Sequence, residues 1–410
     1  MKEKYISYLI IALIVLSSLV SFLLISKQEK TISDENYHLP VIKEFAKNNY
    51  KNKITVTPIP GYHFFVASMI KVFKTDDLAF IRGLSTIIGL FSALVFFKIS
   101  KNIRKKSSKI KTLQFFFFPI IFPYFFVAFT EAFSLLLILI TFYCLLLKKY
   151  KLSGIFGILS VAVRQNNIIW LGFFCLYILF KEYPGLVDIK QKKINFQFLK
   201  QYLRDIWMFI VGFFLFIIFV IVNKGVTMAE KTMHPLGFYE GNLYFILFLF
   251  FIFFLPLNIS NFNKIYNLLK KKKIVIFLVI LVFIIGISTF VSDHPYNQTH
   301  LVWWIRNRIL SHVTSVLLLK IIFFLTVIYS ILSLWVTKLN KKVYYLLYPI
   351  SVLFLSLSWL IEQRFYIIPF TLFILFKEEK SKIVEYSTTA IFIGLTAYLF
   401  YGIQAYRFFL

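Results

Sequence analysis

Acidic residues and cysteines are both scarce in this chain. Its 410 residues hold 18 Asp and Glu against 46 Lys and Arg, and only 2 Cys. Cys144 and Cys175 both lie in apolar runs, so neither a disulfide framework nor a zinc site is expected. No GxGxxG motif follows a predicted strand and there is no P-loop, so the sequence gives no sign of a soluble nucleotide-binding domain.

Charge is absent from long stretches of the chain. Residues 5–26, YISYLIIALIVLSSLVSFLLIS, carry none. At about 1.5 Å per residue this run can span ~30 Å of hydrocarbon. It is too long for a cleavable signal peptide and lacks a small-x-small exit. With 59% hydrophobic residues, 20% aromatic residues and a mean hydropathy of +0.78, the composition is that of a polytopic membrane protein.

The apolar runs predict an all-α polytopic membrane protein with about 13 transmembrane segments, in a range of about 11 to 14. The runs lie at 5–26, 79–100, 112–128, 131–147, 153–163, 168–180, 203–222, 243–260, 274–291, 312–336, 343–361, 365–376 and 388–409. We interpret the short runs 153–163 and 168–180 as a hairpin of half-length helices broken at RQNN. Residues 1–410 are expected to form a single integral membrane domain.

The distribution of lysine and arginine predicts the orientation. If the N-terminus is cytoplasmic and the segments alternate, more than half of the Lys and Arg fall in the inside segments, and most acids fall outside. This agrees with the positive-inside rule. The inside segments are then 1–4, 101–111, 148–152, 181–204, 261–273, 337–342 and 377–387. The net charge of +28 is therefore mainly a topogenic signal that also attracts anionic lipid, and nucleic-acid binding is not expected.

Polar residues gather on the opposite, outside face of this topology. A charge at mid-bilayer costs about 2.5–3.5 kcal/mol, so ionisable groups at span ends usually border a water-filled cavity. We expect a polar site at the outer boundary of the membrane, open to lipid from the side. The clusters are Asp34–His38 with Thr57–His63 in the first external loop (27–78), Glu131, Arg164–Asn167, residues 223–242, residues 292–308 and Glu362–Arg364.

The first external loop predicts two helices at the membrane surface. Residues 34–48 form an amphipathic pattern, and Pro58 and Pro60 predict a bend before a second helix at 61–73. The apolar face of the first helix comprises Leu39, Ile42, Phe45 and Ala46. One interpretation of the adjacent acids needs no chemistry: Ser33 caps the helix, and Asp34 and Glu35 complement its dipole.

The segments resemble, in colinear order, the dolichyl-phosphate-glucose-dependent α-1,2-glucosyltransferases, which add the terminal glucose of the N-glycan precursor. Two departures are an asparagine, Asn166, where the family usually reads RQTNIIW, and Ile59 between the two prolines. The resemblance rests on DENYHLPVIKEF, ITVTPIPGYHF, RGLS, FTEAFSL, RQNNIIW, the loop with MHPLGFYE, DHPYNQTHLVWWIRNR and EQRFYIIPF.

The resemblance implies a GT-C type glycosyltransferase fold with the active site at the lumenal or external face, under the first loop. It implies transfer of glucose from a polyprenyl- or dolichyl-phosphate donor, with inversion, to a glycan or lipid-linked oligosaccharide, forming an α-1,2 linkage. No further cofactor is implied. The protein would lie in the endoplasmic reticulum membrane of a eukaryote, where Asn297 in NQT would be a glycosylation acceptor, or in a prokaryotic plasma membrane.

Two other functions are weighed against this one. Another GT-C enzyme, such as a mannosyltransferase or a protein O-glycosyltransferase, is the nearer alternative. A secondary transporter is the more distant one, because it would place its key charges near the bilayer midplane and show internal repeats. The sequence shows no internal repeat, and its polar clusters gather at one face.

The proposed chemistry assigns roles to the polar residues. A sugar hydroxyl is a poor nucleophile, and Asp34 is the expected general base. Glu35 would hydrogen-bond the acceptor or raise the pKa of Asp34 by like-charge repulsion. Asp34, Glu35 and His38 could also ligate a metal, but no second acid–histidine cluster of ligand spacing accompanies them, so no metal is expected.

The departing phosphate needs positive charge or hydrogen-bond donors. Arg364 and Arg164 are the first candidates to bind it, followed by His38. The alternative for each arginine is a buried structural pair, Arg364 with Glu362 or Arg164 with Glu131. The full set of expected substrate-binding residues is His38, Glu131, Arg164, Gln165, Asn167, His294, Glu362 and Arg364.

Overall fold

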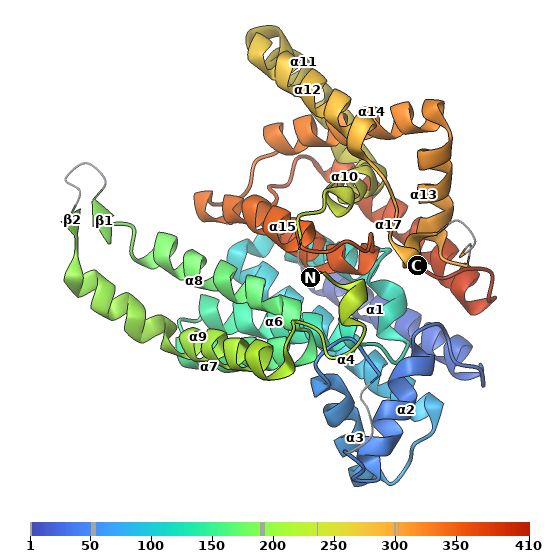
Figure 1. The fold of residues 1–410 in the computed structure, drawn as a ribbon. Helices are drawn as coiled ribbons and strands as arrows, with labels where there is room; N and C mark the ends of the chain where they lie inside the picture. Colours follow the sequence, from blue (N-terminus) through green and yellow to red (C-terminus); the bar gives the residue numbers. More distant parts are fainter. Residues whose placement is uncertain (1, 51–54, 189–192, 236, 299–300, 302) are drawn as a thin grey trace. The chain divides into compact units, whose positions relative to one another are not determined.

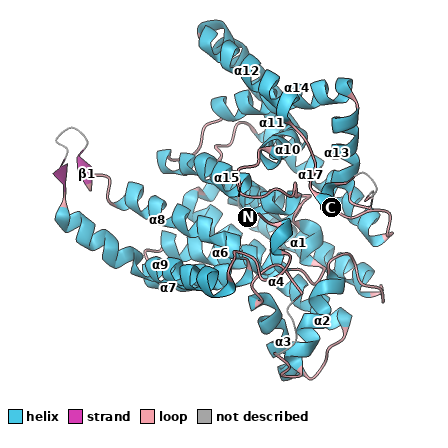
Figure 2. Ribbon diagram, viewed as in Figure 1, coloured by secondary structure: helices cyan, strands magenta, loops and turns pink. Residues whose placement is uncertain are grey.

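The computed structural model describes residues 2–50, 55–188, 193–235, 237–298, 301 and 303–410. Helices dominate these residues, and the sheet found among them is a short antiparallel ribbon of β1 (Val187–Asp188) and β2 (Lys193–Ile194) (Figure 2). The expected all-α class is confirmed. Parts of the expected polar clusters lie outside the described residues, namely 51–54, 236, 299–300 and 302.

The chain forms two compact units, each assembled from separate segments. Unit 1 comprises Met1–Thr112, Tyr124–Thr232 and Lys341–Ile350. Unit 2 comprises Leu113–Pro123, Met233–Asn340 and Ser351–Leu410. The single membrane domain expected for 1–410 stays a prediction.

Unit 1 contains long helices that pass its conserved order of segments from the first apolar run to residue 223 (Figure 1). They are α1 (Lys2–Ser26), α2 (Glu35–Ala46), α3 (Gly61–Phe73), α4 (Leu78–Ile103), α6 (Thr130–Leu146), α7 (Tyr150–Val163), α8 (Ile168–Glu182) and α9 (Phe196–Asn223). Its short 3₁₀ helices are η1 (Lys105–Ser107), η3 (Gln165–Asn167) and η6 (Lys342–Leu346).

Unit 2 begins its main run of helices after the loop at 233–240 (Figure 1). They are α10 (Gly241–Phe253), α11 (Leu255–Lys271), α12 (Lys273–Thr289), α13 (Ile305–Ser315), α14 (Leu317–Val336), α16 (Ile367–Phe376) and α17 (Lys382–Gln404), with the 3₁₀ helices η5 (Pro295–Asn297) and η7 (Gln363–Tyr366). Four elements have residues in both units, namely α5 (Ser108–Phe116), η2 (Phe122–Phe125), η4 (Lys231–Met233) and α15 (Leu347–Ser356).

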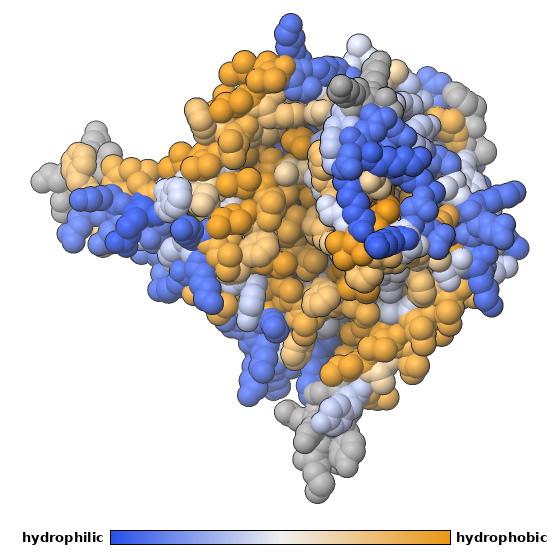
Figure 3. Space-filling model, turned by 90° about the horizontal axis from the view of Figure 1, so that it is seen from below, coloured by the Kyte–Doolittle hydropathy of each residue, from blue (hydrophilic) through white to orange (hydrophobic). Residues whose placement is uncertain are grey.

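Several of these helices suit a membrane. Among the described residues, five helices are long and apolar enough to cross one, namely Tyr8–Ser26, Leu78–Ile103, Phe196–Asn223, Leu317–Val336 and Lys382–Gln404, and the bent pair α10–α11 makes a sixth if it is one span. Phe214 and Ile221 of α9 are 61% and 69% exposed. The face drawn in Figure 3 carries broad apolar surface. The chain is therefore an integral membrane protein, and the count of about 13 segments stays a prediction.

Two apolar runs do not form the single segments expected. Run 112–128 is divided because α5 ends at Phe116, and Pro119 and Pro123 follow within the run. Proline lacks the N–H that a continuous helix needs. Run 243–260 is divided by a 98° bend between α10 and α11, and Pro256 lies in the first turn of α11. In both runs hydrophobicity is continuous while the backbone is not.

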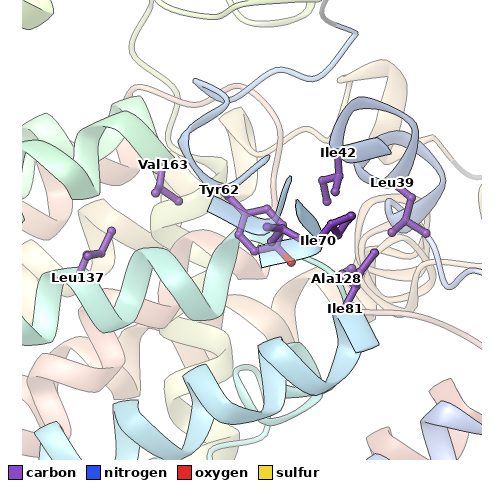
Figure 4. Close-up of a cluster of buried hydrophobic side chains, with 9 residues drawn as sticks. Leu39, Ile42, Tyr62, Ile70, Ile81, Ala128, Leu137 and Val163 are labelled. Atoms are coloured by element: carbon purple, nitrogen blue, oxygen red, sulfur yellow. The ribbon is translucent and has the colours of Figure 1, made fainter. Parts of the chain in front are cut away.

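The first loop folds onto unit 1 as the sequence pattern predicts. The second surface helix spans Gly61–Phe73, as expected, and the first spans Glu35–Ala46. Leu39, Ile42 and Phe45 are buried. A core cluster joins α2 and α3 to α4, α6, α7 and the segment before α6 (Figure 4), and it comprises Leu39, Ile42, Tyr62, Val66, Ile70, Ile81, Ala128, Leu137 and Val163. This packing fixes the position of residues 34 and 35 at the start of α2.

The expected helix break at RQNN is also confirmed. Helix α7 ends at Val163, η3 covers Gln165–Asn167, and α8 begins at Ile168. Arg164 between them has extended backbone angles, φ −143° and ψ 110°. The break therefore presents four polar residues in a row at one end of α7.

Candidate active site

A buried ion pair organises the start of the first loop. Arg82, from α4, and Glu35, from α2, are both 0% exposed. The Arg82 Nε and Nη2 groups donate to the two carboxylate oxygens of Glu35 over 3.1 and 2.6 Å. The other three N–H groups donate to the backbone carbonyls of Ile25, Gln28 and Lys30 over 2.7–3.0 Å. All five guanidinium donors are thereby used.

Glu35 is just as completely occupied. Its carboxylate also accepts the backbone N–H groups of Ile32 at 2.7 Å and Ala128 at 2.8 Å. Four donors therefore fill a group that has about four acceptor sites. This geometry makes Glu35 a structural residue that ties α1, α2 and the segment before α6 together, and it leaves the carboxylate no direction from which to reach an acceptor sugar.

Asp34 lies directly before this ion pair but differs in exposure. It is partly exposed and sits at the N-cap of α2, where its side chain makes no capping hydrogen bond. Ser33 does not cap the helix either, because it adopts a left-handed φ of 54° and it is Glu35 that reaches back to the Ile32 N–H. The interpretation of Ser33 as the cap is therefore wrong, while the helix dipole still acts on Asp34.

His38 is buried against a second histidine. Its Nδ1 lies 2.9 Å from Nε2 of His63, which comes from α3, and its ring meets Phe129 edge-on at 5.6 Å. Burial, reinforced by the neighbouring His38, holds the pKa of His63 well below its ordinary value, so His63 is neutral at pH 7. The pair joins α2 to α3, which gives His38 a structural position in addition to its expected role at the phosphate.

A short segment before and into α6 connects the first loop to the RQNN break. Ala128 bonds Glu35, Phe129 contacts His38, and Glu131 forms an ion pair with Arg164. Glu131 is 2% exposed and Arg164 is 19% exposed. The structural pair considered for Arg164 is thus present, and unit 1 brings together the first-loop, Glu131 and RQNN clusters as the sequence predicts.

The rest of the RQNN break holds the TPIPG bend. The Gln165 side chain accepts the Ile59 N–H and donates to the Thr57 carbonyl, each over 3.2 Å. At Gly61, an added Cβ would lie 2.5 Å from the Ala162 carbonyl oxygen, so only glycine permits this approach of α3 to α7. A residue from the next expected cluster joins them, because the Met228 N–H donates to Thr57 over 3.0 Å.

Asn167 turns away from this bend and into the protein. It is 1% exposed, and its amide donates to the Ser134 hydroxyl over 2.7 Å and to the Ser160 carbonyl over 2.9 Å. These bonds join the break to α6 and α7. Its surroundings are those of a structural residue, so the geometry adds no support for its expected contact with substrate.

Unit 2 contains a second buried carboxylate, and this one serves two arginines. Glu362 is 0% exposed, and its oxygens lie 2.9–3.1 Å from Nη1 of Arg306 and Nη2 of Arg364. Arg306 is 3% exposed and also stacks on Trp304 at 4.2 Å, whereas Arg364 is 16% exposed. The pair considered for Arg364 is present, but Glu362 shares its charge with a second guanidinium that the sequence analysis did not assign.

Two asparagines hold the backbone around Glu362. Asn242 accepts the Glu362 N–H at 3.1 Å, and Asn297 both accepts from and donates to the backbone of Ile361 at 2.9 and 3.0 Å. Asn297 is 1% exposed, and its amide nitrogen is engaged inside unit 2. A glycosylated asparagine carries its sugar on that nitrogen, so the expectation that Asn297 is an acceptor is wrong for the folded protein.

His294 and Gln363 differ in how their polar atoms are used. His294 accepts the Tyr296 N–H at Nδ1 and therefore donates from Nε2 to the Met233 carbonyl at 3.1 Å, which is a structural arrangement. Gln363 is 3% exposed, and neither atom of its amide has a hydrogen-bond partner among the described residues. A buried polar group of this kind calls for an explanation, and a ligand is one.

Comparison with known proteins reveals the family. The model of the DIE2/ALG10 family matches residues 28–375. The chain belongs to the DIE2/ALG10 family. The match covers the first loop, RQNN and Glu362–Arg364, so the residues described above all lie within the family's shared region.

Curated relatives in the DIE2/ALG10 family carry one name, Dol-P-Glc:Glc(2)Man(9)GlcNAc(2)-PP-Dol alpha-1,2-glucosyltransferase. The chain is 26% identical to the protein of Candida albicans over 90% of this chain and 89% of that one. It is 23% and 24% identical to two human proteins, over 87% and 93% of this chain and 86% and 93% of theirs. No solved structure matches the chain significantly.

Three residues of this DIE2/ALG10 member were missed by the sequence analysis. Arg82 could have been found, because it is a single charge near the start of an otherwise apolar 26-residue helix, and such residues are usually functional or paired. His63 and Arg306 each lie within a quoted motif, yet spacing alone could not show that they face His38 and Glu362.

A metal site was not expected in this family member. Within the part of the chain that the structure describes, no three His, Cys, Asp or Glu side chains gather as metal ligands would. The two acids and one histidine considered for the purpose are divided in their orientation, since Glu35 is committed to Arg82 and His38 to His63. That the reaction requires no metal stays a prediction.

Proposed function

We propose that this protein is an inverting glucosyltransferase that moves glucose from a polyprenyl- or dolichyl-phosphate donor to a lipid-linked oligosaccharide, forming an α-1,2 linkage. One observation carries the proposal. The similarity to relatives named for that activity extends over about nine-tenths of the chain and of the relative from Candida albicans, and its family match contains every polar cluster described above. The composition and apolar helices suit an enzyme whose donor is a lipid.

Asp34 is the proposed general base. The attacking sugar hydroxyl must lose a proton as it bonds to the donor's anomeric carbon. Of the two adjacent acids, Glu35 is fully occupied by four N–H donors, whereas Asp34 is partly exposed beside it. The Glu35–Arg82 pair then acts as a rigid support that holds Asp34 at the mouth of the first loop.

The lipid phosphate that departs needs donors more than it needs an acid. Arg364 is the first candidate, because Glu362 divides its charge between two guanidiniums and Arg364 is the more exposed of them. The adjacent Gln363 offers a buried amide that could donate to the same phosphate. Arg164 is the second candidate, since its ion pair with Glu131 leaves it 19% exposed.

The reaction proposed is a single displacement. The family's donor is β-linked and its product is α-linked, so one in-line attack with inversion needs no covalent nucleophile on the enzyme. The bond from the anomeric carbon to the phosphate oxygen breaks, its electron pair leaves with the lipid phosphate, and the hydroxyl proton passes to Asp34.

The finer architecture belongs to the same proposal. We propose a GT-C type fold with about 13 spans and an active site on the outer face. That face is the lumen of the endoplasmic reticulum if the host is a eukaryote. Within unit 1, Glu131 at the start of α6, the RQNN break after α7 and the loop after α9 all contact the first loop or one another. This shared end of three helices supports one polar face.

Purified protein in liposomes tests the proposal. We expect glucose transfer from dolichyl-phosphate glucose to a diglucosylated oligosaccharide lipid, detected as a mass increase of one hexose. Dolichyl-phosphate mannose and UDP-glucose should give no product, and EDTA should leave the rate unchanged. Transfer from the mannose donor alone would replace the proposal with a mannosyltransferase, and direct use of UDP-glucose would eliminate the lipid donor. Product with neither lipid donor present would overturn both.

A further inference from the structure

A basic pocket lies in unit 1, away from the residues assigned to catalysis. It is an open pocket of about 600 Å³. Its lining combines cationic, aromatic and apolar side chains from the start of α7 and from α9, namely Lys148, Lys149, Tyr150, Lys151, Leu152, Ile155, Arg204, Asp205 and Trp207. Four cations face one acid, so the pocket as a whole favours an anion.

The acids nearby neutralise only part of this charge. Glu182 pairs with Lys148 at 2.9 Å, and Asp205 lies 3.6 Å from Arg204 and accepts the Tyr183 hydroxyl. These partners leave Lys149 and Lys151, both exposed, without an ion pair among the described residues. The pocket therefore keeps two cations for a ligand.

The pocket lies at the end of unit 1 opposite to the first loop. Helix α6 starts beside Glu131 and ends at Leu146, next to the pocket, and α7 starts at Tyr150 and ends at the RQNN break. A 14-residue helix is about 21 Å long. Helices α7 and α9 pack against each other along this length (Figure 1). The lysines at 148–151 belong to a segment predicted to be cytoplasmic.

Apolar surface adjoins the charged rim. Trp207 and Leu152 line the pocket and are 43% and 40% exposed. From Trp207 the exposed stripe continues along α9 through Ile210 and Phe214, which are 43% and 61% exposed. Tryptophan favours the interface between water and hydrocarbon. A ligand with a phosphate headgroup and acyl chains would meet both parts of this surface, whereas a free anion would use only the cations.

We propose that this pocket binds an anionic phospholipid of the cytoplasmic leaflet. Its phosphate lies among Lys149, Lys151 and Arg204, and its acyl chains lie along the apolar stripe of α9. The first turn of α7 adds the positive end of a helix dipole to the same place. Basic pockets between membrane helices are suited to such headgroups. The site is separate from the glycosyl transfer and would hold α7 and α9 in place from the inner side.

Native mass spectrometry of the detergent-solubilised full chain tests the site. The probes are dioleoylphosphatidylserine and dioleoylphosphatidylcholine. We expect one phosphatidylserine to be retained in preference to phosphatidylcholine. In the variant Lys149→Gln/Lys151→Gln, the affinity for phosphatidylserine should fall about tenfold, as expected when two cations near a membrane surface are removed. Both lysines are exposed, so the variant should unfold at the same temperature as the unaltered chain.

The matched control is Lys105→Gln/Lys106→Gln, which removes the same charge from two other exposed lysines of a predicted inside segment. It should keep its preference for phosphatidylserine. Equal loss in both variants, equal retention of the two lipids, or full displacement of phosphatidylserine by millimolar inorganic phosphate would each overturn the proposal. Glucose transfer in phosphatidylcholine liposomes should be unchanged in the pocket variant, so failure of the enzymatic proposal leaves this binding measurement intact.

Discussion

The two buried carboxylates, Glu35 in unit 1 and Glu362 in unit 2, differ in how many guanidiniums they serve. Glu35 faces Arg82 alone, and every donor of the arginine is used inside the protein. Glu362 serves Arg306 and Arg364, and the second arginine is partly exposed. The difference teaches that the same pair of residue types can close a fold or leave a cation available for a ligand.

The largest effect expected lies beside the closed pair. Asp34→Asn should lower turnover by about 10²–10⁴, the usual contribution of a positioned general base. Folding should not change, because the amide is nearly isosteric and Asn suits a helix N-terminus as well as Asp does. Turnover in liposomes and the unfolding temperature measure the two parts. Near-normal turnover would show that Asp34 is not the base, and Glu131 would be tested next.

Breaking the closed pair should damage the fold. Glu35→Gln leaves the buried Arg82 charge without its carboxylate, and we expect the free energy of unfolding to fall by about 3–5 kcal/mol. Membrane accumulation and thermal unfolding are the measurements. The double variant Glu35→Gln/Arg82→Met should recover part of the loss, since it removes the uncompensated charge. A fully stable Glu35→Gln that had lost catalysis would instead make Glu35 the base.

The more open centre should respond to changes in a different way. Arg364→Lys keeps the charge but loses the planar fork, so donor affinity should weaken about tenfold while accumulation stays normal. Arg82→Lys is the matched change in the closed pair, and it should reduce accumulation because Lys cannot fill five acceptors. Donor binding can be followed by retention of dolichyl-phosphate glucose. If Arg364→Lys binds donor normally and Arg364→Ala fails to accumulate, Arg364 serves only Glu362.

An exposed ion pair provides the smallest effect. Lys43 lies 3.0 Å from Asp76, and both side chains are about half exposed. Lys43→Gln should change the unfolding free energy by less than about 1 kcal/mol. The hydrogen bond and charge of Lys43 lower the pKa of Asp76. This contribution is therefore present above about pH 4 and is lost as pH falls through the lowered pKa. Unfolding at pH 7 and pH 3, with and without salt, would measure it.

Local punctuation made part of the fold predictable. Pro60 and Gly61 mark the start of α3, and the run of polar residues at 164–167 marks the break between α7 and α8. The same kind of signal was present but not used at Pro123, within run 112–128, and at Pro256, where α10 and α11 bend apart. Hydrophobicity identifies a segment, whereas proline decides whether its backbone is continuous.

Contacts distant in sequence limited prediction of the site. The sequence predicted that the first loop, Glu131 and RQNN meet, and unit 1 confirms it. It could not distinguish Asp34 from Glu35, because the difference depends on Arg82, which lies 47 residues further along. The role of Asn297 was missed for a similar reason, since its amide is held by Ile361, 64 residues away.

The four donors around Glu35 have a consequence for the timing of assembly. The Ile32 N–H precedes Glu35 on the chain, but Arg82 follows by 47 residues and the Ala128 N–H by 93. A ribosome that adds about 5–20 residues per second needs roughly 5–20 s to cover that last interval. Throughout that interval Glu35 awaits its last donor, so the first loop is among the earliest parts synthesised and yet acquires its final shape only after residue 128 has been made.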